Sequence, residues 1–191
     1  MQKTLQYTAG GAGRRRFLRQ ITVTGLGLSL FPSLQAADSA MNRLQALGIT
    51  LPEVPAPAAN YVPWVREKEI VYVAGQLPFR DGELLYPGSV PDRVSVEQAR
   101  AAARQAGINI LAALNAAVEG DLSRVQQCLR LDGYVSSAPA FIQQSAVING
   151  ASDLMVEILG ARGRHTRTAV GAQGLPLDAC VEIAGVFAID R

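Results

Sequence analysis

The pattern of apolar and polar positions predicts two helices in the second half of the chain. Between residues 95 and 120, alanine, leucine and isoleucine recur at three- and four-residue spacing, and strong helix formers fill most of the other positions. This pattern predicts a long helix that Ser95 caps and Gly120 ends. A second helix is expected from Pro139 to Gly160, where Asn149-Gly150 interrupts the helical pattern.

Short runs of β-branched and aromatic residues predict strands on both sides of these helices. Residues 61–65 and 70–75 are expected to form a hairpin, and Asp81-Gly82 marks a further turn. The remaining expected strands cover residues 124–136, 166–171 and 179–190. The resulting order, ββ–α–β–α–ββ, predicts a two-layer α+β domain in which two helices pack on a mixed sheet.

The first 36 residues differ from the rest of the chain. Three arginines precede a Phe-Leu pair within residues 14–18, a moderately apolar run covers 21–34, and small residues surround Ala36. This layout is typical of a cleaved export signal, and the arginines before Phe-Leu resemble a twin-arginine (Tat) signal. We therefore expect a Tat-type signal peptide over residues 1–36 and a periplasmic location. The apolar run over residues 21–34 is too short for a membrane anchor, because a spanning helix needs about 20 apolar residues. We expect no contact with the membrane after cleavage.

A lead-in segment, residues 37–60, is expected between this signal and the main domain, residues 61–191. Residues 39–48 of the lead-in predict a short amphipathic helix that Gly48 ends. Three prolines among residues 51–60 predict an extended segment after it. The mature chain would then have a size typical of a single domain.

The charge of the mature chain argues against a nucleic-acid partner. The first 36 residues hold five basic and no acidic residues, which leaves 13 basic and 16 acidic residues, a net charge of −3, in the remainder. That remainder has no run of cations, whereas nucleic-acid binding depends on clustered cations that neutralise phosphates.

The inventory of reactive residues is small. The chain has one histidine, His165, and its body has one lysine, Lys68, and two cysteines, Cys128 and Cys180. These residues do not suffice for a His/Cys zinc site, and neither a Gly-x-Ser-x-Gly motif nor a Gly-rich phosphate loop is present. We therefore expect no metal and no cofactor. The two cysteines could form a disulfide in the periplasm or be buried thiols, and the sequence leaves both possibilities open.

Several stretches of the body together resemble the YjgF/RidA family, also called the endoribonuclease L-PSP or chorismate-mutase-like family. These stretches are APAANYV, YVAGQLPF, TRTAVG, GLP and VEIAGVFAI. The resemblance covers roughly residues 47–190 and implies a chorismate-mutase-like homotrimer with a central barrel and three clefts between subunits. It also implies a cofactor-independent deaminase, which hydrolyses a small enamine or imine carboxylate such as 2-aminoacrylate to a 2-oxo acid and ammonia.

The same resemblance implies which residues form the site. Arg167 and Thr168 stand at the family's carboxylate-binding motif, and Glu182 stands where the family positions the attacking water. The other implied substrate-binding residues are Ala169, Tyr61, Gln76 and Asn149. Many family deaminases have Cys or Ser where this chain has Ala169, so this alanine leaves the reaction open.

The residues alone also allow plainer interpretations. Arg167 could be a strand-edge charge in an ion pair, and Glu182 could be a solvated carboxylate on a half-buried strand. Strand alternation places Arg167 and Ala169 on one face and Thr168 on the other. The alternative to a deaminase is a non-catalytic trimer that binds a small carboxylate or acts like a chaperone. A ribonuclease is suggested only by the family's older name.

Overall fold

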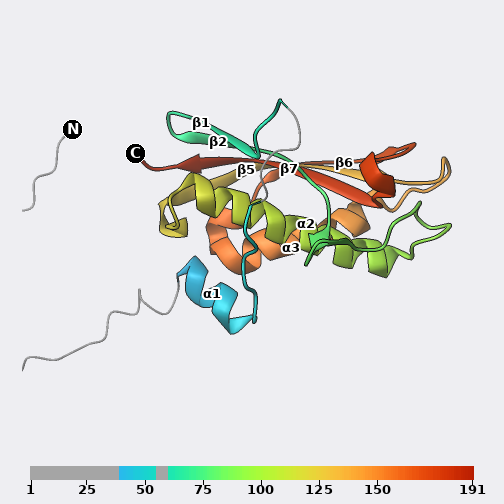
Figure 1. The fold of residues 1–191 in the computed structure, drawn as a ribbon, viewed down its shortest axis with the longest axis horizontal. Coiled ribbons are helices and arrows are strands. Elements are labelled where there is room, and N and C mark those ends of the chain that lie inside the picture. Colours follow the sequence, from blue (N-terminus) through green and yellow to red (C-terminus); the bar gives the residue numbers. More distant parts are fainter. Residues whose placement is uncertain (1–38, 55–59) are drawn as a thin grey trace, which may run out of the picture. The chain divides into compact units, whose positions relative to one another are not determined.

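Two helices cover one face of a five-stranded mixed sheet (Figure 1). This computed structural model describes residues 39–54 and 60–191. The predicted export signal and its cleavage site lie outside the described residues. The predicted two-layer α+β fold is confirmed in these residues.

The sheet has the strand order β1-β2-β7-β5-β6. Its strands are β1 (Trp64–Glu67), β2 (Ile70–Gln76), β5 (Val125–Ser136), β6 (Thr166–Ala172) and β7 (Val181–Ile189). Neighbouring strands are antiparallel, except that β5 and β6 run parallel. A parallel pair requires a crossover connection, and α3 (Gln144–Leu159) provides it. The strand that carries Arg167 is therefore the outer strand of a β5–α3–β6 unit.

The long helix α2 (Val96–Ala117) begins and ends close to the predicted positions. The Ser95 hydroxyl accepts from the Gln98 amide, and the Gln98 side chain accepts from the Ser95 amide, which is a complete capping box. Alanines dominate its buried face, and α2 packs on both α3 and the sheet. Small side chains allow this close approach.

Two details of the second helix differ from the prediction. It begins at Gln144 rather than at Pro139, because Pro139 and Ala140 form a turn that the bond from the Phe141 amide to the Ala138 carbonyl closes. It also continues without a break through Asn149-Gly150. A methyl group on Gly150 would overlap the carbonyl oxygen of Arg100 in α2. Glycine here therefore permits the close crossing of the two helices and does not interrupt α3.

The hairpin β1–β2 forms as predicted, but β1 begins at Trp64, so Tyr61 precedes the strand. The predicted turn at Asp81-Gly82 joins β3 (Phe79–Arg80) to β4 (Glu83–Leu84). Both turn residues have positive φ, 54° and 82°, as a type I′ turn requires.

The lead-in helix α1 (Ala40–Ala46) packs against α3. Ser39 caps it, Ala40 and Leu44 are buried, and Nη1 of Arg43 donates to the carbonyl of Ile158 at 3.2 Å. Within residues 39–54 and 60–191, the short 3₁₀ segments are η2 (Leu122–Arg124), η3 (Gly160–Gly163) and η4 (Pro176–Asp178).

The core lies between the helices and the sheet, and it contains both cysteines. Cys128 and Cys180 are free and fully buried. Burial raises the pKa of the Cys128 thiol to about 12 and that of the Cys180 thiol to about 11. Within residues 39–54 and 60–191, no helix combines the length and the apolar character that crossing a bilayer requires.

Candidate functional site

Arg167 lies on the outer strand β6, and two neutral side chains of α3 hold it. Its Nη1 donates to Oδ1 of Asn149 at 2.7 Å and to Oγ of Ser152 at 3.1 Å. Asn149 and Ser152 are three residues apart, so they share one face of the helix. The structure thus brings two predicted site residues, Arg167 and Asn149, into direct contact.

The guanidinium group of Arg167 keeps one edge available. Its Nη1 carries two protons, and the two hydrogen bonds use both of them. No described carboxylate forms an ion pair with Arg167, although many other arginines of the described chain have such a partner. Nε and Nη2 therefore present an exposed pair of donors to which no described residue bonds. This arrangement fits an anionic ligand better than a strand-edge ion pair.

The neighbours of Arg167 on β6 alternate in direction as predicted. Arg167 pairs with buried Leu131 of β5 and Ala169 pairs with Gly133, so both face the helices. Ala169 is partly buried against the core. Thr168 faces the opposite side, where its hydroxyl accepts from Nη2 of Arg130 at 3.1 Å. The structure therefore does not bring the Thr168 side chain to Arg167.

Glu182 lies on the sheet face that α2 and α3 leave uncovered. It alternates with buried Val181 and Ile183 in β7 and pairs with Tyr134 of β5. Its carboxylate makes no hydrogen bond or ion pair to a described residue, and burial raises its pKa above the ordinary value for a glutamic acid. Such a carboxylate is a stronger proton acceptor than a solvated one.

Gly75 provides the room that the Glu182 side chain occupies. A methyl group on Gly75 would overlap Oε1 of Glu182 and lie 2.9 Å from its carboxyl carbon. The pairing of β2 with β7 shifts register between Val73 and Gln76, which is a bulge at this position. Bulges beside functional residues re-aim side chains, and this one lets the Glu182 carboxylate lie against the backbone of β2.

Tyr61 and Gln76 line a cavity of about 620 Å³ next to Gly75. Much of its lining is apolar and comes from the residues before β1, the loop after β2 and the 3₁₀ segment η4. Tyr61 is 57% exposed, and Nε2 of Gln76 donates to the carbonyl of Ala74 at 3.2 Å. Tyr61, Gln76 and Glu182 thus belong to one region around Gly75.

Arg167 and Glu182 are distant within one chain. Arg167 of β6 and Gly185 of β7 both pair with Leu131 of β5, the strand between them, so the three residues form one row across the sheet. Glu182 lies three residues before Gly185 along β7. A rise of about 3.3 Å per residue and a strand spacing of about 4.8 Å place their Cα atoms roughly 14 Å apart. Their side chains also point to opposite faces. The predicted site residues of one chain therefore fall into two separate groups, an arginine half-site with Asn149 and a glutamate half-site with Tyr61 and Gln76, and both are candidates only by their geometry.

Ser152 and His165 are functional candidates that the sequence analysis missed. Oγ of Ser152 lies 3.0 Å from Nε2 of His165, and Nδ1 of His165 lies 2.7 Å from the carbonyl oxygen of Gly163. The sequence offered one signal for Ser152, its i, i+3 spacing from Asn149 on the same helix. That spacing indicates a shared contact with Arg167 only when α3 is known to lie beside β6.

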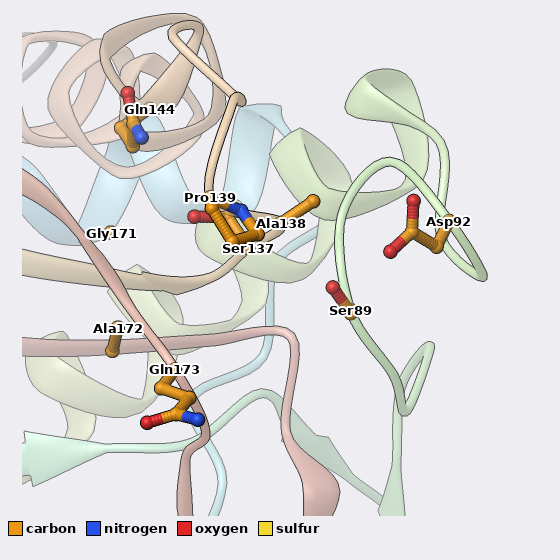
Figure 2. A pocket seen from close by; sticks show the side chains of 9 residues that line it. All are labelled: Ser89, Asp92, Ser137, Ala138, Pro139, Gln144, Gly171, Ala172 and Gln173. Carbon is orange, nitrogen blue, oxygen red and sulfur yellow. The ribbon is translucent and has the colours of Figure 1, made fainter.

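A second cavity of about 500 Å³ opens at the carboxyl ends of β5 and β6. Figure 2 shows its lining side chains: Ser89 and Asp92 come from the loop before α2, Ser137, Ala138 and Pro139 follow β5, and Ala172 and Gln173 lie at the end of β6. None of the predicted site residues lines it. Within the part of the chain that the structure describes, no three His, Cys, Asp or Glu side chains are grouped to hold a metal ion.

Comparison with known proteins identifies the relatives of this chain. The family model described as YjgF/chorismate_mutase-like, putative endoribonuclease matches residues 41–188. Protein TCP17 of Trypanosoma cruzi is 41% identical over 160 residues, which are 83% of this chain and 99% of that protein.

Two crystal structures are similar in sequence and in fold. A protein of unknown function from Agrobacterium tumefaciens is 43% identical, with a TM-score of 0.75, over 82% of this chain and 96% of that one. A protein from Shewanella oneidensis, called a putative endoribonuclease, is 34% identical, with a TM-score of 0.76, over 79% of this chain and 99% of that one. The fold, the matched residues and these relatives agree with the resemblance seen in the sequence: the chain belongs to the YjgF/chorismate-mutase-like family, of which RidA is a member.

Proposed function

We propose that the protein hydrolyses small imines or enamines that carry a carboxylate, releasing a 2-oxo acid and ammonia. The observation that carries this proposal is the exposed Nε–Nη2 edge of Arg167, which no described residue occupies. A planar guanidinium with two parallel N–H groups binds a carboxylate through two hydrogen bonds, and these fix both the charge and the orientation of the ligand. The anionic end of the substrate is therefore assigned to Arg167.

Glu182 is the proposed general base. Its raised pKa and the lack of a described hydrogen-bond partner leave its carboxylate available to a water molecule. The carboxylate takes a proton from this water as the water oxygen bonds to the imine carbon. The electron pair of the C=N bond moves to nitrogen, which takes up a proton. This addition leaves one hydroxyl and one amino group on the carbon. The hydroxyl then gives up its proton and an oxygen lone pair forms the carbonyl of the 2-oxo acid, while the carbon–nitrogen bond breaks and the amino group takes up a proton and leaves as ammonia.

A complete site requires more than one copy of the chain, because Arg167 and Glu182 lie on opposite faces of the sheet. The uncovered face exposes Val65, Tyr72, Tyr134 and Val170, whose exposed fractions are 40–52%. An apolar sheet face of this kind suits packing against other copies. We propose a homotrimer in which Arg167 of one copy and Glu182 of the next form each site, and light scattering of the purified protein should give the mass of three chains.

We also propose that the chain acts outside the cytoplasm, because residues 1–36 have the layout of a Tat signal. Residues 1–40 fused to a reporter that is active only after export should carry it to the periplasm. Replacing Arg14, Arg15 and Arg16 with lysine should keep the reporter inside. Export of the lysine variant through the Tat route would contradict this assignment.

Ammonia release tests the deaminase proposal directly. An amino-acid oxidase or lyase supplies fresh 2-imino acids to the protein lacking residues 1–36, and ammonia is measured above the spontaneous rate. Arg167→Ala should lower kcat/KM at least about 100-fold, the loss expected for two charge-assisted hydrogen bonds. Glu182→Gln should lower kcat about 100-fold or more and leave pyruvate binding intact.

Matched controls are Arg66→Ala and Glu67→Gln, which remove the same charges from the opposite edge strand β1. Both controls should keep the activity of the unmodified protein. If the unmodified protein releases no ammonia above background from several imino acids, the deaminase proposal is wrong.

A non-catalytic carboxylate-binding trimer is the second candidate. It is favoured by Ala169, which packs against the core and offers no reactive group where many deaminases of the family have Cys or Ser. This candidate predicts that pyruvate raises the melting temperature of the unmodified protein but not of Arg167→Ala. It also predicts no turnover that depends on Glu182.

A further inference from the structure

Three consecutive hydrogen bonds connect the Arg167 guanidinium, the Ser152 hydroxyl, the His165 ring and the backbone carbonyl of Gly163 in η3. The donor and the acceptor of each bond can be assigned. The carbonyl of Gly163 can only accept, so Nδ1 of His165 carries the proton at this contact. In the neutral ring, Nε2 is then an acceptor, and the Ser152 hydroxyl donates to it at 3.0 Å. The oxygen of Ser152 in turn accepts from Nη1 of Arg167 at 3.1 Å.

This direction determines what Ser152 offers to the arginine. A serine hydroxyl rotates freely and can donate to any nearby acceptor. Because the Ser152 proton is committed to His165, the lone pairs of the serine oxygen stay directed toward the N–H of Arg167. Asn149 engages the other proton of Nη1. The two bonds clamp the guanidinium at one nitrogen and leave the opposite edge free for a ligand.

The arrangement is poorly suited to make Ser152 a nucleophile. In hydrolytic triads, a carboxylate on Nδ1 stabilises the charged imidazole that forms when the histidine takes the serine proton. Here Nδ1 bonds to a neutral backbone carbonyl. The Ser152 oxygen is also occupied by Arg167. Both contacts favour an orienting role over a covalent one.

We infer that Ser152 and His165 are positioning residues that hold Arg167 edge-on for bidentate binding of the substrate carboxylate. This inference rests on the proposed function only in taking Arg167 as the carboxylate-binding group. A merely structural role would make the two residues important for folding but would not link them to the ligand.

Gly163 supplies the last acceptor in this series of hydrogen bonds. A methyl group on Gly163 would overlap the carbonyl oxygen of Met155 and lie 2.7 Å from the Cα atom of Val156. Only glycine therefore fits at the end of η3, where the chain lies against the backbone of α3 and the Gly163 carbonyl accepts from His165. The packing of Gly163 against the last turns of α3 thus helps to fix the orientation of the His165 ring.

Pyruvate binding, measured by calorimetry, tests the inference with four variants. Ser152→Ala and His165→Asn should weaken binding about fivefold to tenfold, the usual effect of losing one hydrogen bond that orients a charged group. His165→Gln places an amide oxygen near the position of Nε2, so it can still accept from Ser152 and should recover most of the affinity. Ser145→Ala removes an exposed hydroxyl from the same helix and should bind like the unmodified protein.

The single histidine gives a second, independent readout. His165 is the only histidine of the chain, so protein purified without a histidine tag shows one set of imidazole signals in nitrogen-15 NMR. The free protein should show the tautomer with the proton on Nδ1. Pyruvate should shift the Nε2 signal of the unmodified protein, and Ser152→Ala should abolish that shift without changing the melting curve appreciably.

The outcomes separate this inference from the proposed reaction. Pyruvate binding without ammonia release removes the deaminase proposal and leaves the inference standing. Unchanged pyruvate affinity in folded Ser152→Ala and His165→Asn overturns the inference and leaves the deaminase proposal standing. A proton found on Nε2 in the free protein also overturns it. If the unmodified protein binds no pyruvate, the carboxylate role of Arg167 and this inference fall together.

Discussion

Gly150→Ala tests the close crossing of α2 and α3. The added methyl group would overlap the carbonyl oxygen of Arg100, and it would lie 3.0 Å from the carbonyl carbon of Arg100 and from the amide nitrogen of Arg104. Ordinary contacts between such atoms need about 3.5–4.0 Å, so the contact with the carbonyl oxygen alone requires the helices to separate by more than about 1 Å. All three clashing atoms belong to the backbone of α2 and cannot rotate away.

The expected cost follows from two opposing effects. Overpacking of a core costs about 1–3 kcal/mol, and the rigid backbone partners place this site at the upper end of that range. Alanine stabilises a helix by about 1 kcal/mol relative to glycine. The net loss of unfolding free energy is therefore about 2 kcal/mol, which for a domain of this size lowers the melting temperature by roughly 4–8 °C.

Thermal and urea unfolding of the purified protein measure this loss. The matched control is Gly174→Ala, because no atom lies within 4 Å of the added methyl group and its φ is outside the left-handed region. That control should be neutral or slightly stabilising, by up to about 1 kcal/mol. A Gly150→Ala protein that melts at or above the unmodified protein, with the same urea dependence, would refute the reasoning.

Four further predictions concern the glutamate half-site, the cysteines and the helix cap. Gly75→Ala should displace the Glu182 carboxylate that it would overlap, so kcat should fall at least about tenfold while pyruvate affinity stays unchanged. Glu182→Gln should raise the melting temperature at pH 8 more than at pH 4. A carboxyl whose folded-state pKa is raised costs stability once the pH rises through that value. Cys128 and Cys180, with thiol pKa values raised to about 12 and 11, should resist iodoacetamide at pH 8 until the protein is unfolded, as mass spectrometry would show. Ser95→Ala should cost about 1 kcal/mol in urea unfolding, because it removes the hydroxyl of the capping box.

Most of the fold follows from local patterns in the sequence. The helical spacing of residues 96–117, the cap at Ser95 and the turn at Asp81-Gly82 depend on neighbours along the chain, so sequence reasoning finds them. The prediction that Gly150 interrupts the helix is wrong, because the contact that requires a glycine there is with α2, about 50 residues earlier in the chain. A glycine that breaks a helix and a glycine that admits a second helix look alike in one sequence.

The candidate site residues could be named from the sequence, but their geometry could not. Alternation along β6 placed Arg167 and Ala169 on one face, and the structure agrees. The relative faces of Arg167 and Glu182 depend on the register between three strands, which one sequence does not contain. Ser152 was missed because its partners, Arg167 and His165, become its neighbours only when α3 crosses beside β6.

The neighbouring pair Asn149-Gly150 constrains how this protein can evolve. Consecutive residues of a helix point about 100° apart, so Asn149 meets Arg167 while Gly150 meets α2. A substitution at Gly150 that pushes α3 outward would also carry Asn149 and Ser152 away from the arginine. The orientation of Arg167 and the packing of α2 against α3 therefore depend on the same short stretch of α3.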